Sequence, residues 1–426
     1  MIPDKGEPIV IRLLIIADDF TGGLDTGVQF ASRGIPTCVL TDPEEDFSAA
    51  AGDCEVLVIV AETRHLPATE AYDAVYRTAR KGAELGIGHI YKKTDSALRG
   101  NIGAELAAVF QACGAPVLPF IPSLPAMNRI TRNGIQYIDG VPVAQSVFGK
   151  DPFEPVKESD VTRLISLQTD LPVGKAPADQ VSRCKGIAVI DSASEEDLRQ
   201  AGLSLGRIEN LRVSAGCAGF ASVLPDLLHL SSRGIPELPV LDRGLFVLCG
   251  SVNPITQRQL DYGEKHGFVR THIAPEVKLH PEIFRSEEGR AILSGWKKQM
   301  ASENWMILDA NDTDPRNMET AVRAAEEGLS IEDVRQRISE SLGIILSELA
   351  DTPAERTLLI TGGDTLLKSM NRMKVFRMMP LTEVFPGVVL SRVILCGRSR
   401  FVITKSGGFG EETLLSDVKR LISEKK

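Results

Sequence analysis

Short apolar runs alternate with amphipathic segments along nearly the whole chain. Segments 68–85 and 194–205, and the segment that begins near residue 102, have apolar positions at helical spacing. The apolar runs between them are short and uninterrupted, as in strands that are buried on both faces of a parallel sheet. Strands that alternate with helices in this way predict an α/β fold. In the first half of the chain the runs occupy residues 11–17, 37–40, 55–60, 89–92, 116–121 and 187–190.

The alternation is interrupted once, near residues 231–243, by an extended segment that contains Gly234, Pro236 and Pro239. Extended segments of this composition commonly separate domains. A second series of apolar runs follows at residues 244–249, 305–309, 357–361 and 400–404. The sequence therefore predicts two Rossmann-like, three-layer α/β domains, residues 1–235 and 240–426, with mainly parallel sheets and a cleft between them.

One long helix is predicted directly after Ser330, where apolar positions recur every three or four residues. We expect this stripe to pack against the core of the second domain and to have no role in binding. Its members are Ile331, Val334, Ile338, Leu342, Ile345 and Leu349.

Two adjacent carboxylates, Asp18 and Asp19, follow the first apolar run, and Thr21 and Gly22-Gly23 come next. In α/β folds, ligands bind at the carboxyl ends of parallel strands. The alternative is that Asp19 or Thr21 caps the following helix, which is a frequent arrangement. Capping explains one of these residues but not all of them, so we favour a functional site.

Polar side chains also follow the next predicted strands. Arg64 comes after residues 55–60, and its planar guanidinium matches a carboxylate with two hydrogen bonds. Arg129 lies in a later loop, where an arginine is often merely solvated, and His65 is more typical of a loop residue than of a base. The densest cluster follows residues 89–92 and consists of Lys93, Asp95, Ser96 and Arg99. These strand ends predict one pocket with both charge signs, as a polyhydroxylated acid would require.

In the second half, glycine pairs follow two of the predicted strands. A strand that re-enters a helix through such a turn directs backbone N–H groups and the positive end of the helix dipole at one point, which favours a phosphate. The first turn comprises Thr361, Gly362, Gly363 and Asp364, the second comprises Lys405, Ser406, Gly407 and Gly408, and Ser251 follows a third strand. No GxxxxGK[ST] motif is present, so the pattern predicts a nucleotide crevice that is not a P-loop.

Composition excludes several classes of protein. The 426 residues carry a net charge of −9, which argues against a nucleic-acid partner because phosphate backbones require a basic face. The seven cysteines form no CxxC pair and no metal-spaced cluster. The chain shows no signal-peptide pattern and no apolar run of about eighteen residues. We therefore expect a cytoplasmic protein with no membrane partner.

Taken together, five motifs resemble the four-carbon acid sugar kinases. In chain order they are Ala17–Asp25, Lys92–Asn101, Gly250-Ser251, Thr361–Asp364 and Lys405–Gly410, and they span almost the whole sequence. The resemblance implies an N-terminal sugar-acid-binding domain and a C-terminal nucleotide-binding domain. It also implies ATP-dependent phosphorylation of the terminal (4-) hydroxyl of threonate, erythronate or 3-oxo-tetronate.

By matched position, the resemblance implies that Ser251, Thr361 to Asp364 and Gly407 contact ATP. It implies that the substrate pocket is lined by Asp18, Asp19, Lys93, Asp95, Ser96 and Arg99. Two departures stand out: Asn128-Arg129 replaces the Gly-Arg common in relatives, which is expected to alter the fit of the acid, and Gly-Gly-Asp replaces Gly-Gly-Glu at residues 362–364. The second departure favours D-threonate or D-erythronate over 3-oxo-tetronate.

Phosphoryl transfer needs positioning and charge stabilisation more than covalent help. We expect Arg99, helped by Lys93 or Arg64, to hold the substrate carboxylate while Asp18, Asp19 or Asp95 accepts the proton of the hydroxyl. Lys405 and the turn at residues 407–410 would hold the ATP phosphates, with Mg²⁺ bridging their oxygens and Asp364 contacting nucleotide or metal-bound water. The two halves are expected to close around the substrates and exclude water.

Two other classes remain open at the level of sequence. One is a sensor that binds a sugar acid and nucleotide without turnover, which the intact carboxylates disfavour. The other is an NAD-dependent oxidoreductase, which the lack of GxGxxG after any predicted strand disfavours. The stereochemistry of the acid, the identity of the base, the metal ligands and the oligomeric state, with a homodimer as one option, stay undetermined.

Overall fold

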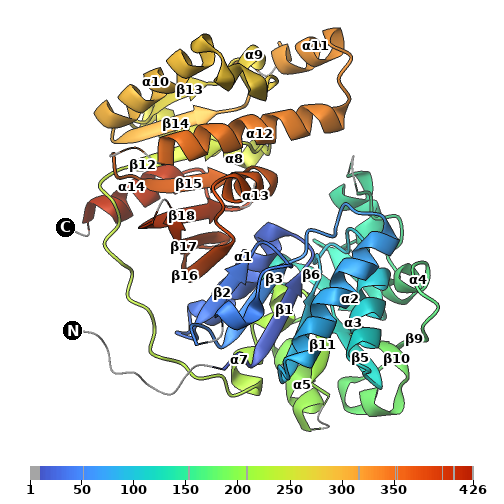
Figure 1. Cartoon of the computed structure of the whole chain (residues 1–426). Helices are drawn as coiled ribbons and strands as arrows, with labels where there is room; N and C mark the ends of the chain where they lie inside the picture. The colour runs from blue at the N-terminus through green and yellow to red at the C-terminus, as the bar shows by residue number, and fades with distance from the viewer. Residues whose placement is uncertain are drawn as a thin grey trace. The chain divides into compact units, whose positions relative to one another are not determined.

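The computed structural model describes residues 10–424 except 51, 152–153, 208–209, 315–316, 351, 353, 396 and 406–407, and it leaves the side chains of residues 48, 49 and 364 undescribed. The chain divides into two units, Met1–Pro236 and Glu237–Lys426 (Figure 1). In each unit, mostly parallel strands have helices on both faces, so the α/β prediction is confirmed. The cleft expected between the two stays a prediction.

The N-terminal unit is organised around a sheet in which every strand pair described here is parallel. The middle strands consist almost entirely of buried aliphatic residues, so helices must cover both faces. The strand order is β2 (Thr37–Leu40), β3 (Val56–Val60), β1 (Leu13–Ala17), β4 (His89–Lys93), β11 (Val213–Gly216), β5 (Val117–Ile121), β10 (Gly186–Val189) and β9 (Val173–Lys175).

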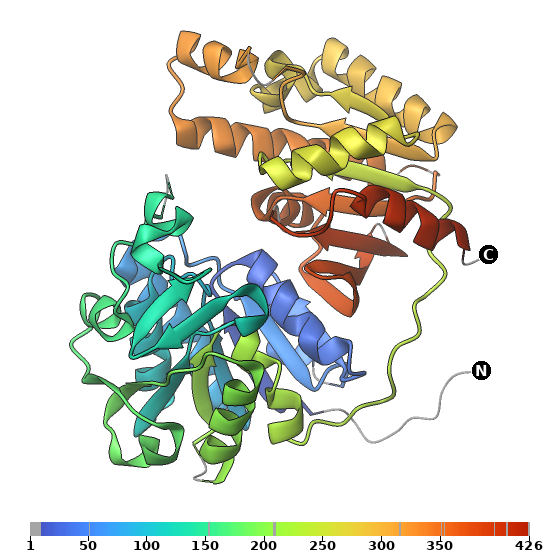
Figure 2. The same ribbon diagram turned by 180° about the vertical axis from the view of Figure 1, so that it is seen from behind.

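Helices α2 (Ala68–Glu84) and α3 (Ile102–Ala112) cover the face of this sheet seen in Figure 1. Figure 2 shows α1 (Phe20–Ala31), α5 (Glu195–Arg207) and α6 (Ala218–Ala221) on the opposite face. The remaining elements of this unit are α4 (Val161–Ser166), α7 (Leu224–Leu227), the 3₁₀ turns η1 (Phe47–Ala50), η2 (Pro125–Met127), η3 (Val143–Gln145), η4 (Val147–Lys150) and η5 (Ala178–Arg183), and a small antiparallel sheet of β6 (Arg129–Arg132), β7 (Ile135–Ile138) and β8 (Val141–Pro142).

The C-terminal unit has a mixed sheet. Its strand order is β13 (Val269–His272), β14 (Trp305–Asp309), β12 (Leu245–Cys249), β15 (Thr357–Thr361), β18 (Arg398–Lys405), β17 (Val388–Leu395) and β16 (Arg377–Phe385). The strands from β13 to β18 pair in parallel, whereas β17 and β16 continue the sheet antiparallel. Because β12 lies between β14 and β15, the chain reverses direction across the sheet at β12. Such switch points form ligand crevices at the carboxyl end of the strands.

Helices α12 (Ile331–Ala350) and α13 (Gly363–Arg372) lie on one face of this sheet, and α8 (Pro254–Lys265) and α14 (Leu414–Glu424) lie on the other (Figures 1 and 2). Leu260 of α8 and Leu415 of α14 join the aliphatic residues of β12, β15 and β18 in one buried cluster. The other helical elements are α9 (Pro275–Lys278), η6 (Pro281–Arg285), α10 (Glu287–Ser302) and α11 (Glu319–Glu326). In the described part of the chain, every helix is too short or too polar to span a bilayer.

The structure differs from the sequence-based expectations in three places. Residues 213–216 form the strand β11, which the apolar runs of the sequence did not indicate. The edge strand β13 and the antiparallel pair β16 and β17 were not predicted. Ile331 was expected in the core stripe of α12 but is 71% exposed, while Leu342, Ile345 and Leu349 are fully buried. Periodicity identifies the apolar face of a helix but not how much of its length has a packing partner.

Candidate functional site

Three strands of the N-terminal sheet end at the same level. Ala17, the last residue of β1, pairs with Val60 of β3 on one side and with Lys93 of β4 on the other. The residues that follow these strands therefore leave the sheet at one edge. This register brings together the three strand ends that the sequence singled out.

The guanidinium of Arg64 lies among three carboxylates at this edge. Its Nη2 atom is 2.8 Å from Asp18, 2.8 Å from Asp19 and 3.9 Å from Asp95. Its Nε atom also donates to Asp18 Oδ2 at 2.8 Å. Arg64 is thus occupied by the protein's own carboxylates, so we interpret it as a residue that orders them and not as the clamp for a substrate carboxylate.

Asp18 and Asp95 are held as carboxylates by their neighbours. Burial alone would raise both pKa values. Arg64 and Lys93 outweigh burial at Asp18, and Arg64 and Arg99 outweigh it at Asp95, so both pKa values lie below the ordinary range. Arg99 binds Asp95 with two nitrogens, Nε at 2.8 Å from Oδ2 and Nη2 at 3.1 Å from Oδ1. The guanidinium of Arg99 is therefore largely engaged, which differs from its expected role as the main carboxylate clamp.

Asp19 caps helix α1 and also faces the charged cluster. Its Oδ1 atom accepts from the backbone N–H of Gly22 at 3.0 Å, and its side chain keeps 25% of its surface exposed. A Cβ at residue 22 would lie within 2.6 Å of both Asp19 Oδ1 and Lys93 Nζ, so any other residue there would displace one or both of these groups. Asp19 therefore caps α1 and also belongs to the candidate site. Thr21 lies half-buried in the first turn of α1.

Arg129 is the cation of this site with no carboxylate of its own. It comes from β6, and its Nη1 atom donates to Ser96 Oγ at 2.5 Å. No carboxylate in the described part of the chain lies within ion-pair distance of it. Burial lowers the pKa of Arg129, and attraction to Asp95 offsets this only in part. Such a guanidinium gains stability from any anion that enters the site.

Lys93 is the second weakly paired cation. Its Nζ atom is 3.8 Å from Asp18 Oδ1, beyond hydrogen-bond distance. Beneath it, Lys92 and Glu105 form a fully buried ion pair at 2.9 Å, and Lys92 Nζ donates to the backbone oxygens of Ile16 and Lys93. This pair fixes the ends of β1 and β4 on which the site rests. The sequence pattern does not mark Glu105, because this residue belongs to the apolar segment of α3.

Three further residues reach the site from the segment after β8. The ring of Phe148 lies 5.2 Å from both the Arg99 and the Arg129 guanidinium carbons, a cation–π distance. Asp151 lies 3.6 Å from Arg99, and burial raises the pKa of Glu154 against the attraction of Arg64 and Arg99. No strand-end pattern marks this segment in the sequence, so only the fold reveals it.

Asn128 occupies a left-handed backbone position, with φ of 52°. Glycine adopts this conformation without strain, and asparagine tolerates it better than most residues. The replacement of glycine by asparagine noted in the sequence therefore has a backbone explanation. Its expected effect on the fit of the acid stays a prediction.

In the C-terminal unit, the strand ends of β12, β15 and β18 carry the residues expected to bind ATP. Ser251 Oγ accepts from the backbone N–H of Asn253 at 3.3 Å, and the buried Thr361 donates its hydroxyl to Cys249 Sγ at 3.2 Å. Gly362 has φ of 103°, which permits the sharp turn into α13, and Gly363 begins that helix. Ser406, Gly407 and the side chain of Asp364 lie outside the described residues, and Gly408 is exposed.

Lys405, the last residue of β18, is buried close to the turn that follows it. Its Nζ atom donates to Thr256 Oγ1 at 2.9 Å and to the backbone oxygen of Phe409 at 3.2 Å. Burial lowers the pKa of this amine to about 8. A phosphate placed beside it would favour the charged form.

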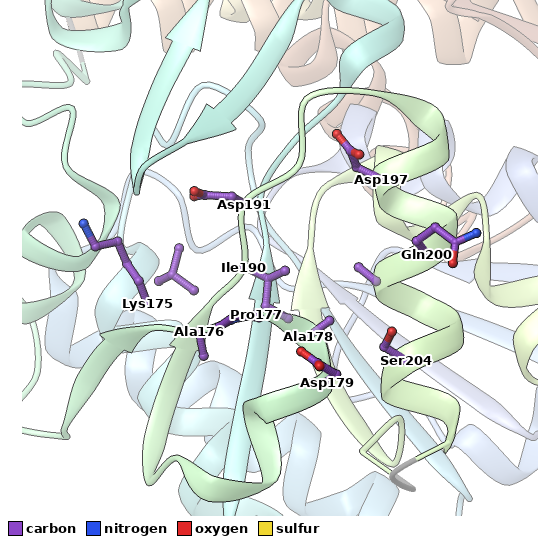
Figure 3. Close-up of a pocket in the computed structure, with 12 residues that line it drawn as sticks. Lys175, Ala176, Pro177, Ala178, Asp179, Ile190, Asp191, Asp197, Gln200 and Ser204 are labelled. Atoms are coloured by element: carbon purple, nitrogen blue, oxygen red, sulfur yellow. The ribbon is translucent and has the colours of Figure 1, made fainter.

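A hollow of about 470 Å³ lies elsewhere in the N-terminal unit, between β9, β10 and α5 (Figure 3). Its polar side chains are largely engaged with backbone atoms: Asp191 with Gly134 N, Asp197 with Ala193 N and Lys175 with Asn133 O. These side chains are also exposed, and the hollow contains none of the buried charges described above. We therefore place the candidate site at the ends of β1, β3 and β4.

Two family models match this chain. Residues 13–224 match the family model described as a sugar-binding N-terminal domain, and residues 246–415 match a nucleotide-binding C-terminal domain. A crystal structure of a Salmonella typhimurium protein has the same fold, with a TM-score of 0.80 at 22% identity over 96% of this chain and 99% of that one.

Similar proteins with assigned activities are named as kinases. The D-threonate kinase of Salmonella typhimurium is 28% identical over 97% of this chain and 99% of its own length. The D-erythronate kinase of Heliobacterium modesticaldum is 25% identical over 90% of each, and the 3-oxo-tetronate kinase of Methylobacterium radiotolerans is 24% identical over 94% of this chain and 96% of its own. The chain therefore belongs to the four-carbon acid sugar kinase family, and it is a phosphotransferase with an alcohol group as acceptor.

Proposed function

We propose that the protein uses ATP to phosphorylate the 4-hydroxyl of a four-carbon sugar acid, with D-threonate or D-erythronate favoured over 3-oxo-tetronate. The N-terminal unit would bind the acid and the C-terminal unit the nucleotide. The observation that carries the proposal is Arg129, a partly buried guanidinium for which the described residues provide no carboxylate, in the same charged cluster as three aspartates. A cytoplasmic location follows as part of the proposal because ATP is the phosphoryl donor.

Arg129 is the residue that we assign to the substrate carboxylate, with Lys93 as its helper. Arg64 and Arg99 already bind aspartates at 2.8 Å, so a substrate carboxylate would have to displace those contacts. Among the described residues, Arg129 donates a side-chain hydrogen bond only to Ser96 and contacts the ring of Phe148, so donors remain for a ligand. The guanidinium fork would bind both carboxylate oxygens, and Lys93 would contact a hydroxyl or one of the same oxygens.

Asp19 is the best placed candidate for the base. Both oxygens of Asp95 are engaged by Arg99, and Asp18 is buried with Oδ2 bound to Arg64. Asp19 keeps part of its carboxylate exposed while Arg64 and Gly22 fix its orientation. In this arrangement Asp19 would orient the 4-hydroxyl and take its proton as the phosphoryl group is transferred.

The nucleotide phosphates would bind at the turn after β18, with Lys405 as the cation. Mg²⁺ typically binds through substrate phosphates, waters and one or two carboxylates, so it needs no cage of protein ligands. The described residues contain no group of three or more His, Cys, Asp or Glu side chains placed to hold a metal, which fits that mode of binding. When bound, Mg²⁺ would neutralise charge on the phosphate oxygens.

The test is ADP release with Mg-ATP against D- and L-threonate, D- and L-erythronate and 3-oxo-tetronates. Turnover with one acid supports the proposal and names the substrate. ATP binding without turnover on any member would contradict the proposed acceptor. Binding of both acid and nucleotide without ADP release would instead support the alternative, a sensor with the same fold.

A further inference from the structure

The side chain of Gln259 in α8 donates hydrogen bonds to the backbone of the turn after β18. Its Nε2 group lies 3.0 Å from the backbone oxygen of Phe409, 2.9 Å from that of Gly410 and 3.0 Å from that of Glu411. Gln259 is only 1% exposed. Three consecutive carbonyl groups therefore point toward α8, where they share the two N–H bonds of the Gln259 amide.

This contact determines which way the amides of the turn face. In a trans peptide the C=O of one residue and the N–H of the next point in opposite directions, and the described chain contains no cis peptide. The N–H groups of residues 410, 411 and 412 are therefore directed away from α8. No hydrogen bond from these three N–H groups to another described residue is present. Successive N–H groups that face one side form a cradle for an anion.

Helix α8 also organises the cation beside the turn. Thr256, one turn before Gln259, accepts from Lys405 Nζ at 2.9 Å, and Lys405 donates in addition to Phe409 O. Lys405 and the three carbonyl groups are thus positioned by the same helix face. Gly263, one turn further along, packs against Leu415 of α14 and fixes the other end of the turn.

We propose that Gln259 is a positioning residue for the nucleotide: by binding three carbonyl groups, it turns the N–H groups of residues 410–412 toward the phosphates of ATP. This inference rests on the proposed function, because it assigns the phosphates to this turn. Gln259 itself makes no contact with the nucleotide. Its effect is on ATP binding and not on recognition of the sugar acid.

The test replaces Gln259 by methionine, which has similar length and no donor. In Gln259→Met the Gly410 oxygen loses the one partner that it has among the described residues, and the Phe409 and Glu411 oxygens keep only Lys405 Nζ and the Leu414 N–H. The peptide planes of the turn are then less constrained. We expect the KM for ATP to rise about tenfold, which corresponds to about 1.4 kcal/mol, the size of one or two ordinary hydrogen bonds. The KM for the sugar acid should stay within about twofold of the wild type, because its site is in the other unit.

Gln336→Met is the matched control, because Gln336 is exposed on α12 and its side chain bonds only to Glu332 at 3.3 Å among the described residues. Calorimetric titration with ADP, without turnover, should show the same loss of affinity in Gln259→Met and none in the control. A purely structural role for Gln259 would lower the melting temperature and leave the KM for ATP unchanged, and that result would overturn the inference.

Gln259→Glu provides a second variant if the methionine protein does not fold. A carboxylate facing three carbonyl oxygens repels them, so ATP binding should weaken at least as much. A KM for ATP within about twofold of the wild type in a folded variant overturns the inference. Failure of the wild-type protein itself to bind ATP or ADP would overturn the proposed function, and the two failures are therefore distinguishable.

Discussion

The candidate sites of the two units both lie at the carboxyl ends of parallel strands, but they consist of different chemical groups. At the ends of β1, β3 and β4, four cations and several carboxylates form a network in which Arg64, Arg99 and their aspartates are fixed before any ligand arrives. At the end of β18, glycine-rich backbone and one buried lysine take their place. Side-chain charges at fixed positions select a particular acid, whereas backbone N–H groups recognise phosphate in general.

The largest effect is expected from neutralising Asp19, the proposed base in the N-terminal unit. Asp19→Asn keeps an N-cap for α1 and the shape of the side chain but abolishes its charge. We expect kcat to fall at least about 100-fold, the lower range for loss of general-base catalysis, with the fold intact. Steady-state ADP release and the melting temperature measure the two effects.

The control for Asp19→Asn is Asp170→Asn, because Asp170 is exposed on the same unit. Near-normal turnover in Asp19→Asn would remove Asp19 from the base assignment and direct attention to Asp95→Asn. Near-normal turnover in both Asp19→Asn and Asp95→Asn would contradict the mechanism.

Arg129→Met tests the assignment of the carboxylate clamp. Loss of a charged, two-pronged contact should raise the KM for the sugar acid about 10- to 100-fold and leave the KM for ATP nearly unchanged. Arg132→Met is the matched control, because Arg132 ends the same strand and is exposed. If the KM for the acid is unaffected by Arg129→Met but rises in Arg99→Met, then Arg99 holds the substrate carboxylate, as the sequence analysis expected.

The affinity of the C-terminal unit for ATP should depend on pH through Lys405. The pKa of Lys405 is lowered to about 8 in the free protein, and a bound phosphate raises it again. ATP affinity should therefore be full below pH 8 and weaken as pH rises above it. In Lys405→Met affinity at pH 7 should be about tenfold lower and the decline above pH 8 should disappear, as titration with ADP across this range would show. A decline that persists in the variant would assign it to another group.

The smallest effect is expected for Asp151→Asn. Asp151 lies 3.6 Å from Arg99, and both side chains are partly exposed, so the contact contributes well under about 1 kcal/mol. We expect less than about a fivefold change in the KM for the acid. A larger change would mean that Asp151 contacts the substrate directly.

The sequence was informative about the candidate site residues that directly follow a strand. Asp18, Arg64 and Lys93 follow recognisable apolar runs, and the register of β1, β3 and β4 brings them together. It was uninformative about pairing, because Arg64, Arg99 and Arg129 look alike until the fold shows that two of them already hold aspartates.

Phe148, Asp151 and Glu154 could not be predicted for a different reason. They reach the site only because the segment after β8 folds back over Arg99 and Arg129, which depends on contacts distant in sequence. Similarly, β11 occupies a central position with small residues of weak strand preference, so tertiary packing decided its conformation.

Asp19 is both the cap of α1 and the proposed base, and this combination has an evolutionary consequence. The same oxygen that caps α1 belongs to the carboxylate that we assign to catalysis, and asparagine caps a helix as well as aspartate does. A single-nucleotide change in its codon would therefore remove the proposed base and keep the helix cap, while Asp18 and Asp95 would still pair with Arg64. A lineage of this family has a short path from enzyme to ligand-binding receptor, and the residue at position 19 would be the first place to look for it.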